Sequence, residues 1–317
     1  MRILVTGGRG TIGRVLTPWL RCLGHEVWTC DLNHHHDPRH VRCDVSEFRQ
    51  LGRLLDSQPF ELVYHLAAEY GRWNGEEYYE QLWRTNVVGT KHLLRLQERL
   101  RFRVVFASTS EVYGDADEPM REDLLDQKEV RQLNDYALSK WVNEQQILLS
   151  AARFDTETVR VRLFNTYGPG EYFSEFRSAI CRFAYSALMG LPYTVYLNHR
   201  RTSIFISDAV RTLAKLADVF VPGEVYNIGG TESHDMKQIS DTILGLLGKD
   251  DALVTYAEQE PFTTKNKQVD CTKAARSIGH LPCVPLRVGL GQTLAWMRRI
   301  YVDRQEVEPT EFLELAS

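Results

Sequence analysis

Short apolar runs alternate along this chain with segments in which apolar residues recur at every third or fourth position. The runs end near Asp31, Cys43, Leu66 and Ala107, or occupy residues 3–5, 158–164 and 225–228. Such runs are typical of buried strands. The helical periodicity predicts helices over residues 12–23, 46–56, 79–100, 136–153, 174–189, 207–219, 235–247 and 287–300. Strands that alternate with helices predict an α/β fold with a parallel sheet that is covered on both faces.

The sequence TGGRGTIG at residues 6–13 lies between the first predicted strand and the first predicted helix. Glycines there let the backbone turn tightly and approach a pyrophosphate, and the free N–H groups of the next helix attract phosphates. Asp31 ends the second strand, where a carboxylate accepts hydrogen bonds from ribose hydroxyls and would repel a 2′-phosphate. We therefore expect a site for NAD rather than NADP. Arg9, which could reach a 2′-phosphate, is the one residue that argues the other way.

Composition narrows the classes of protein that fit. A net charge of −4 argues against a nucleic-acid binder, and no apolar run approaches the length of a membrane span. The first predicted strand begins at residue 2, which leaves no room for a signal peptide, and the six cysteines show no CxxC pairing. We expect reduced thiols and a cytoplasmic protein. Three consecutive histidines at residues 34–36 point in different directions, so we expect a solvated loop and no metal.

Tyr136 and Lys140 are four residues apart in a predicted helix, which puts both side chains on one face. A lysine ammonium beside the phenol, together with a cationic nicotinamide ring, favours the phenolate, so that Tyr136 could act as a base near neutral pH. This spacing is common by chance, and a solvent-facing pair is the ordinary alternative.

The segment STSEVYG at residues 108–114 follows a predicted strand, where open parallel sheets place their ligand crevice. Thr109 can hydrogen-bond a substrate hydroxyl, and Glu111 can move a proton. A polar strand end followed by a turn is the alternative. The combination with the glycine turn, Tyr136 and Lys140 favours a catalytic site.

With these motifs the chain resembles the extended short-chain dehydrogenase/reductase family, in particular its NAD-dependent nucleotide-sugar epimerases, dehydratases and decarboxylases. The resemblance covers about residues 2–300. It implies a Rossmann-type, doubly wound parallel sheet over residues 1–165, to which the strand near 225–228 returns. A smaller C-terminal substrate-binding lobe would occupy residues 166–301. We expect the acidic tail at residues 302–317 to be loosely ordered.

The resemblance also implies a set of site residues. The cofactor-binding residues would be Gly7, Gly10, Thr11, Ile12, Gly13, Asp31, Leu32, Asp44, Val45, Leu66, Ala67, Ala68, Asn86, Tyr136 and Lys140. The catalytic residues would be Thr109, Glu111, Tyr136 and Lys140. A nucleotide-diphosphate sugar would be bound by Ser110, Asn165, Arg201 and Lys267.

Two segments depart from the family pattern. The family usually has an arginine three residues before the aspartate equivalent to Asp270, and Lys267 stands there, which replaces a bidentate fork with a point charge. The sequence EYGRWNG at residues 69–75 belongs to no common branch, although it should border the sugar. The substrate is therefore expected to be unusual.

The shared first step of the family is oxidation of sugar C4 by NAD, with Tyr136 taking the hydroxyl proton. The Ser110-Glu111 pair resembles certain dehydratases and decarboxylases, so we place 4,6-dehydration first, with Glu111 removing the C5 proton. The residue after Arg201 is not the aspartate found in many dehydratases, which favours decarboxylation as the next alternative. Epimerisation at C4 is third.

Two other kinds of protein stay open. A sensor that binds NAD without turnover would need none of the four catalytic residues. A reductase that consumes NADPH is disfavoured by Asp31. The resemblance further implies a homodimer in which the helices at 79–100 and 136–153 pair across a two-fold axis. Candidates for this interface, or for the core instead, are Leu93, Leu94, Val142 and Ile147.

Overall fold

A seven-stranded parallel sheet forms the centre of the computed structural model, which describes residues 1–115 and 118–312. The strand order is β11-β6-β5-β4-β1-β2-β3. The strands are β1 (Arg2–Thr6), β2 (Glu26–Asp31), β3 (His40–Arg42), β4 (Leu62–His65), β5 (Arg103–Thr109), β6 (Thr158–Leu163) and β11 (Val225–Ile228). The order reverses between β1 and β4, and such a reversal opens a ligand crevice beyond the carboxyl ends of the strands. The predicted parallel α/β sheet is confirmed.

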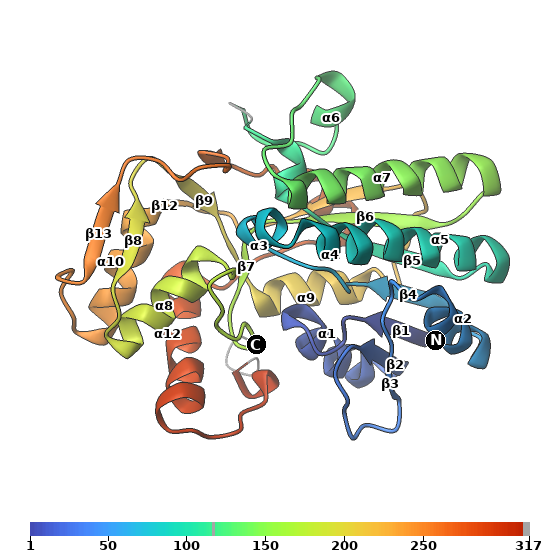
Figure 1. Ribbon diagram of the computed structural model, residues 1–317, viewed down its shortest axis with the longest axis horizontal. Coiled ribbons are helices and arrows are strands. Elements are labelled where there is room, and N and C mark those ends of the chain that lie inside the picture. Colours follow the sequence, from blue (N-terminus) through green and yellow to red (C-terminus); the bar gives the residue numbers. More distant parts are fainter. Residues whose placement is uncertain (116–117, 313–317) are drawn as a thin grey trace.

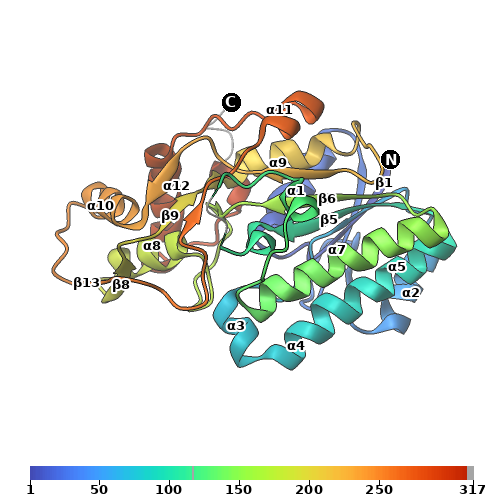
Figure 2. The same cartoon turned by 90° about the horizontal axis from the view of Figure 1, so that it is seen from above.

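Helices cover both faces of this sheet (Figures 1 and 2). The helices of one face are α2 (Phe48–Ser57), α5 (Gly89–Leu100) and α7 (Asp135–Phe154). Those of the other face include α1 (Thr11–Cys22) and α9 (Ile206–Lys215). Side chains of β1 alternate between the two layers: Ile3 and Val5 pack under α1, and Leu4 packs under α2 and α5.

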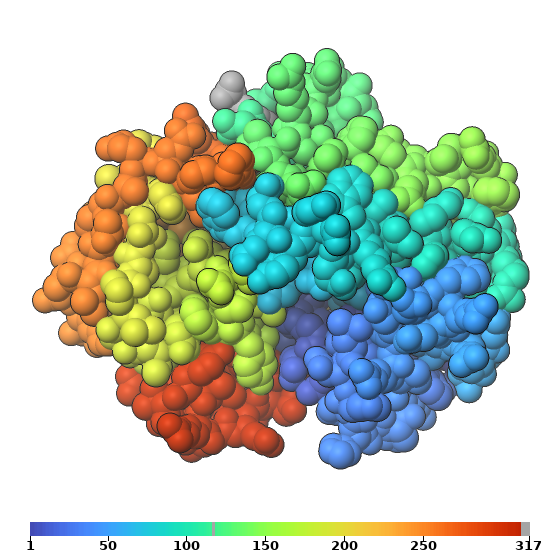
Figure 3. Space-filling view, viewed as in Figure 1, coloured from blue at the N-terminus to red at the C-terminus, as the bar shows by residue number. Residues whose placement is uncertain are grey.

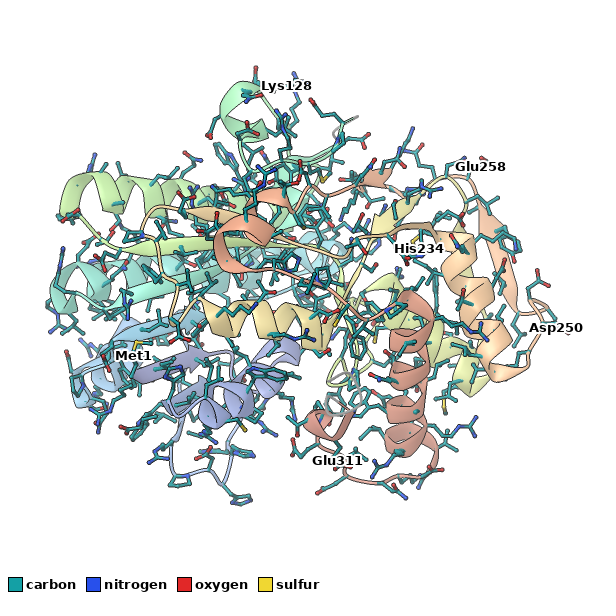
Figure 4. All side chains as sticks on the ribbon, turned by 180° about the vertical axis from the view of Figure 1, so that it is seen from behind. Met1, Lys128, His234, Asp250, Glu258 and Glu311 are labelled. Carbon is teal, nitrogen blue, oxygen red and sulfur yellow. The ribbon has the colours of Figure 1, made fainter. Side chains whose placement is uncertain are left out.

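A lobe built from the C-terminal half lies beside the N-terminal part of the molecule that holds most of the sheet, as the colours of the surface show (Figure 3). Its helices are α8 (Ala179–Met189), α10 (Met236–Leu247) and α12 (Leu286–Met297). Its strands are β8 (Tyr193–Tyr196), β9 (Arg200–Thr202), β12 (Ser233–Asp235), β13 (Val254–Ala257) and β14 (Asn266–Lys267). His234, Asp250 and Glu258 mark this lobe in Figure 4, on the opposite side from Met1. One hydrophobic cluster runs from the sheet into the lobe, so the two parts share a core.

Shorter elements connect these parts. They are α3 (Arg72–Glu77), α4 (Tyr79–Trp83), α6 (Leu124–Gln127), β7 (Thr166–Tyr167), β10 (Ile204–Phe205) and α11 (Thr272–Ile278). A π-helical segment (Arg84–Val88) joins α4 to α5, and a 3-10 turn (Ser110–Tyr113) follows β5. Within the described residues, no helix is long and apolar enough to cross a bilayer.

Two regions differ from what the sequence predicted. The residues of α9, predicted to belong mainly to the lobe, pack against α1, and the hydroxyl of Tyr64 in β4 donates to Leu213 O at 2.9 Å. The tail is packed as far as it is described, because Val307 is buried and Arg299 pairs with Glu311 at 3.0 Å.

The sequence leaves the candidate interface residues open between the core and an interface. Leu93, Leu94 and Ile147 lie in the core between helices and sheet, and Val142 is half-buried. Periodicity alone could not separate the core face of these helices from an interface face, because both are apolar.

Candidate active site

A cavity of about 590 Å³ opens between the carboxyl ends of the strands and the lobe. It brings together every predicted site residue except Asn86. Its lining includes Gly7, Gly10, Thr11, Ile12, Gly13, Asp31, Leu32, Asp44, Val45, Leu66, Ala67, Ala68, Thr109, Ser110, Glu111, Tyr136, Lys140, Asn165, Arg201 and Lys267. These residues come from segments far apart in the chain, which meet because parallel strands end at one edge of the sheet.

The glycine turn forms a cradle with no space for side chains. Gly7 has φ +68°, and a Cβ there would lie 2.8 Å from the Ala67 amide nitrogen at the end of β4. A Cβ on Gly13 would clash with the carbonyl oxygen of Gly7. Gly10 precedes α1 without a side-chain cap, so the first N–H groups of this helix are left for a ligand. The turn therefore fits the pyrophosphate of a dinucleotide.

Asp31 lies at the far end of the same cavity. Its Oδ2 accepts from the Arg9 amide at 3.0 Å, and its Oδ1 accepts from the Leu32 amide at 2.8 Å. Asp44 and Val45 complete this end. Two backbone N–H groups thus fix the Asp31 carboxylate in the cavity wall, and its contact with the adenosine ribose of NAD stays a prediction.

Asn86 lies in the π-helical segment and is buried outside the cavity lining. Its side-chain amide donates to Glu69 O and Ser139 Oγ, both at 3.1 Å, and its carbonyl accepts from the Glu69 amide at 2.8 Å. This position differs from the predicted contact with the cofactor. Asn86 instead fixes the backbone at the start of the 69–75 segment against α7.

Tyr136 and Lys140 lie in the first turns of α7, whose start is capped by Asn134 through the Ala137 amide at 2.8 Å. Lys140 Nζ donates to Ala107 O at 2.8 Å, and burial lowers the pKa of Lys140 to about 8. Thr109, at the end of β5, is hydrogen-bonded to Tyr136. The three residues thus face the cavity from two neighbouring elements.

Burial raises the pKa of Tyr136 to about 12, although the hydrogen bond with Thr109 lowers it and Glu111 raises it further. The sequence predicted a lowered value, with a cationic nicotinamide ring beside the phenol. The protein groups by themselves give the opposite direction, because desolvation disfavours the phenolate.

Glu111 forms an ion pair with Lys267. Burial opposes ionisation of Glu111, but Lys267, with help from Arg72 and Arg201, outweighs it and holds the pKa of Glu111 below its ordinary value. Burial also lowers the pKa of Lys267 to about 8, against the effect of Glu111. Both partners are therefore charged at neutral pH, and Glu111 is a weaker base than an isolated carboxylate.

Arg201 lies beside Lys267, because β9 and β14 pair in parallel with these two residues in register. Arg201 Nη1 donates to Lys265 O at 2.9 Å, and its Nη2 donates to Thr263 Oγ1 at 3.2 Å. Asn165 Nδ2 donates to Thr202 O at 3.0 Å, which ties the end of β6 to the same strand. The two cations and the amide form a wall suited to a diphosphate.

Part of the cavity lining was not predicted from the sequence. Arg72 comes from the unusual segment that was expected to border the sugar, so its general position could be predicted. Arg182, His199 and Glu260 come from the lobe and belong to no recognisable motif. Only the folded chain brings these three side chains to the cavity.

The model of the NAD dependent epimerase/dehydratase family matches residues 3–229. A UDP-N-acetyl-alpha-D-glucosaminuronate decarboxylase of Bacillus cytotoxicus is 28% identical over 95% of this chain and 99% of its own. A UDP-glucuronic acid decarboxylase 1 of Xenopus tropicalis is 30% identical over 94% of this chain and 72% of its own. Relatives with lower identity include dTDP-glucose 4,6-dehydratases. The solved structure of MoeE5 with UDP-glucuronic acid and NAD superimposes with a TM-score of 0.85 at 30% identity, covering 94% and 99% of the two chains.

Proposed function

Because this chain belongs to the NAD-dependent epimerase/dehydratase family, we propose that it transiently oxidises C4 of the sugar in a nucleoside diphosphate sugar. The observation that carries the proposal is the placement of Thr109, Tyr136 and Lys140 in the cavity that also contains the glycine cradle and Asp31. NAD, when bound, takes up the C4 hydride and later returns it. The cradle fits this cofactor because its glycines line the cavity and leave no space for side chains of their own.

The protein groups move the proton of this first step. Tyr136 accepts the proton of the C4 hydroxyl, and Thr109 holds both the phenol and the sugar hydroxyl in line. Lys140 is fixed by Ala107 O and supplies positive charge behind Tyr136. Arg201 and Lys267 bind the diphosphate. Loss of the hydride and the hydroxyl proton leaves a 4-keto sugar.

For the second step we propose loss of carbon dioxide from a uronate. The 4-keto group lets the C5–C6 bond break: its electrons pass into an enolate, carbon dioxide leaves, and a proton is returned to C5. This step needs no base at C5. It is therefore compatible with Glu111, whose basicity is lowered by its ion pair with Lys267. Two relatives named as uronate decarboxylases, and a similar structure bound to UDP-glucuronic acid, support a uronate substrate.

A 4,6-dehydratase is the second candidate, because Glu111 lies in the cavity next to Ser110. In that reaction Glu111 would remove the C5 proton and hydroxide would leave C6. The sequence placed this reaction first, and it stays a prediction.

Product analysis separates these reactions. The purified protein is incubated with UDP-glucuronate, UDP-glucose, dTDP-glucose and GDP-mannose, and products are identified by mass spectrometry. We expect carbon dioxide to be released from UDP-glucuronate. Loss of water from a neutral hexose would identify the protein as a dehydratase and reject decarboxylation. A product of unchanged mass with an inverted C4 would identify it as an epimerase. No turnover of any sugar would leave the sensor alternative.

A further inference from the structure

Arg72, the first residue of α3, lies in the cavity wall without a role in the steps above. Its Nη2 donates to Glu260 Oε2 at 2.8 Å, and Glu260 Oε1 faces Arg182 Nη2 at 3.6 Å. Glu260 and Arg182 belong to the lobe, whereas Arg72 follows β4 of the sheet. This ion-pair chain therefore joins the two sides of the cavity.

The surrounding segment fixes the direction of Arg72. Gly71 has φ +92°, and a Cβ there would lie 2.6 Å from Phe176 O, so only glycine fits without a shift of the backbone. The Trp73 ring meets Phe262 edge-on, with ring centroids 6.0 Å apart. The unusual EYGRWNG sequence thus presents one arginine to the cavity in a defined position.

Several polar atoms of this wall are left without a protein partner. Arg72 Nη1 and both ring nitrogens of His199 are buried, and none has a hydrogen-bond partner within residues 1–115 and 118–312. His199 is only 1% exposed, and it lines the cavity with Arg72 and Glu111. Burial, with a contribution from Arg201, lowers the pKa of His199 to about 4, so its neutral ring carries one donor and one acceptor. Buried donors that lack a partner are costly, which points to a ligand group here.

We propose that Arg72 and His199 form a subsite for a carboxylate on the substrate sugar, and that Arg72 determines the preference for a uronate over a neutral hexose. The inference rests on the proposed function, since Thr109 and Tyr136 place the sugar in this cavity. Arg72 Nη1 donates to one carboxylate oxygen and the His199 N–H donates to the other. Glu260 offsets part of the Arg72 charge, so the carboxylate is oriented without being held so strongly that carbon dioxide could not leave.

The test measures binding without turnover. In a Tyr136→Phe background, dissociation constants are determined calorimetrically for UDP-glucuronate, UDP-glucose and UDP in the NAD-loaded protein. We expect UDP-glucuronate to bind more tightly than UDP-glucose, and Arg72→Gln to reduce this preference about tenfold or more, as is usual for the loss of a hydrogen bond to a charged group. UDP-glucose and UDP should bind to Arg72→Gln as before. Arg72→Lys, which keeps the charge without the planar fork, should lose part of the preference.

Arg200→Gln is the matched control, because Arg200 lies next to Arg201 but its Nη2 donates to Ser233 O at 2.9 Å, outside the cavity. An equal loss of affinity for all three ligands in Arg72→Gln, at unchanged melting temperature, would make Arg72 a structural residue and overturn the proposal. Equal affinity of the Tyr136→Phe protein for the uronate and the hexose would overturn it too. The binding test involves no turnover, so it is independent of the product analysis. A lack of carbon dioxide release would reject the decarboxylation step, but it would not change the ratio of the dissociation constants for UDP-glucose and UDP-glucuronate.

Discussion

Glu111 and Lys267 are separated by 156 positions in the sequence, yet they form an ion pair in the cavity wall. The pair joins the residue predicted to move a proton to the residue predicted to bind the diphosphate. Because Lys267 holds Glu111 ionised, the carboxylate is ready to accept a proton but is a weak base. The role of Glu111 can therefore be tested by removing its charge.

The first prediction concerns Glu111→Gln. The initial oxidation uses Tyr136 and Thr109, so reduced cofactor should still form on addition of UDP-glucuronate, as followed by absorbance. Carbon dioxide release should also continue, because decarboxylation needs no base at C5. If the enzyme is a dehydratase, the loss of this base should instead stall the reaction at the 4-keto sugar, with turnover slowed about 10²–10⁴-fold. Tyr136→Phe is the matching variant that should abolish the oxidation itself.

The second prediction concerns pH. The pKa of Lys267 is lowered to about 8, so its ammonium is present below that pH and is lost as the pH rises through it. Loss of this charge weakens diphosphate binding, so kcat/KM should fall as the pH rises above about 8. Lys267→Arg should move this fall to higher pH, because a guanidinium stays protonated. If kcat/KM of Lys267→Arg falls at the same pH as in the unaltered protein, the prediction is contradicted. The titrating group would then be Lys140, whose pKa is also about 8.

At the scale of elements, the turn between β1 and α1 combines a local sequence signal with a tertiary constraint. The glycines are visible in the sequence, but the reason for each one lies in its neighbours. Gly7 faces the end of β4, and Gly13 faces Gly7. The cradle is thus formed by contacts between the turn, the helix and the neighbouring strand.

The third prediction follows from this packing. Gly13→Ala should abolish or strongly weaken NAD binding, because the added Cβ meets the Gly7 carbonyl oxygen and the turn must open. Retained NAD after purification, and NAD titration by calorimetry, measure the effect. Gly245→Ala is the control: this glycine lies in α10 with open space around it, so alanine should raise the stability by about 0.8–1 kcal/mol and leave NAD binding unchanged. Normal NAD affinity of Gly13→Ala would argue against the cradle.

At the scale of the whole molecule, α5 and α7 lie side by side on one face of the sheet (Figure 2). Their inner sides are filled by core residues, which include three of the four predicted interface candidates. Apolar side chains nevertheless remain on the outside: Val88 before α5 is 44% exposed, and Leu148 and Leu149 on α7 are 41% and 46% exposed. An apolar outer surface on paired helices is a feature of helix-bundle interfaces.

The fourth prediction is that the protein is a homodimer that buries this outer surface. Light scattering at micromolar concentration should give the mass of a dimer. Replacement of both Leu148 and Leu149 by Glu should give a monomer, because charges would then be buried against apolar groups. Leu281→Glu changes an equally apolar residue, 72% exposed in the loop between α11 and α12, and should leave the dimer intact. A monomeric mass for the unaltered chain would reject the interface.

The sequence by itself determined the alternation of strands and helices, the glycine turn with Asp31, and the segments that carry Thr109, Tyr136 and Lys140. These features depend on periodicity and on short motifs, in which neighbouring residues specify backbone conformation and direction. The sequence also marked residues 69–75 as unusual, without indicating what they do.

Only the tertiary structure decided which distant side chains meet. It paired Glu111 with Lys267, joined Arg72 to Glu260 and Arg182, and placed Asn86 behind the cavity. It also raised the pKa of Tyr136, turned Leu93 and Leu94 into the core, and packed residues 309–312 of the tail beside α1. Such contacts depend on side chains that are brought together by chain topology and desolvated there. No local sequence pattern indicates which distant side chain a residue will contact, or that its polar group will lose contact with water.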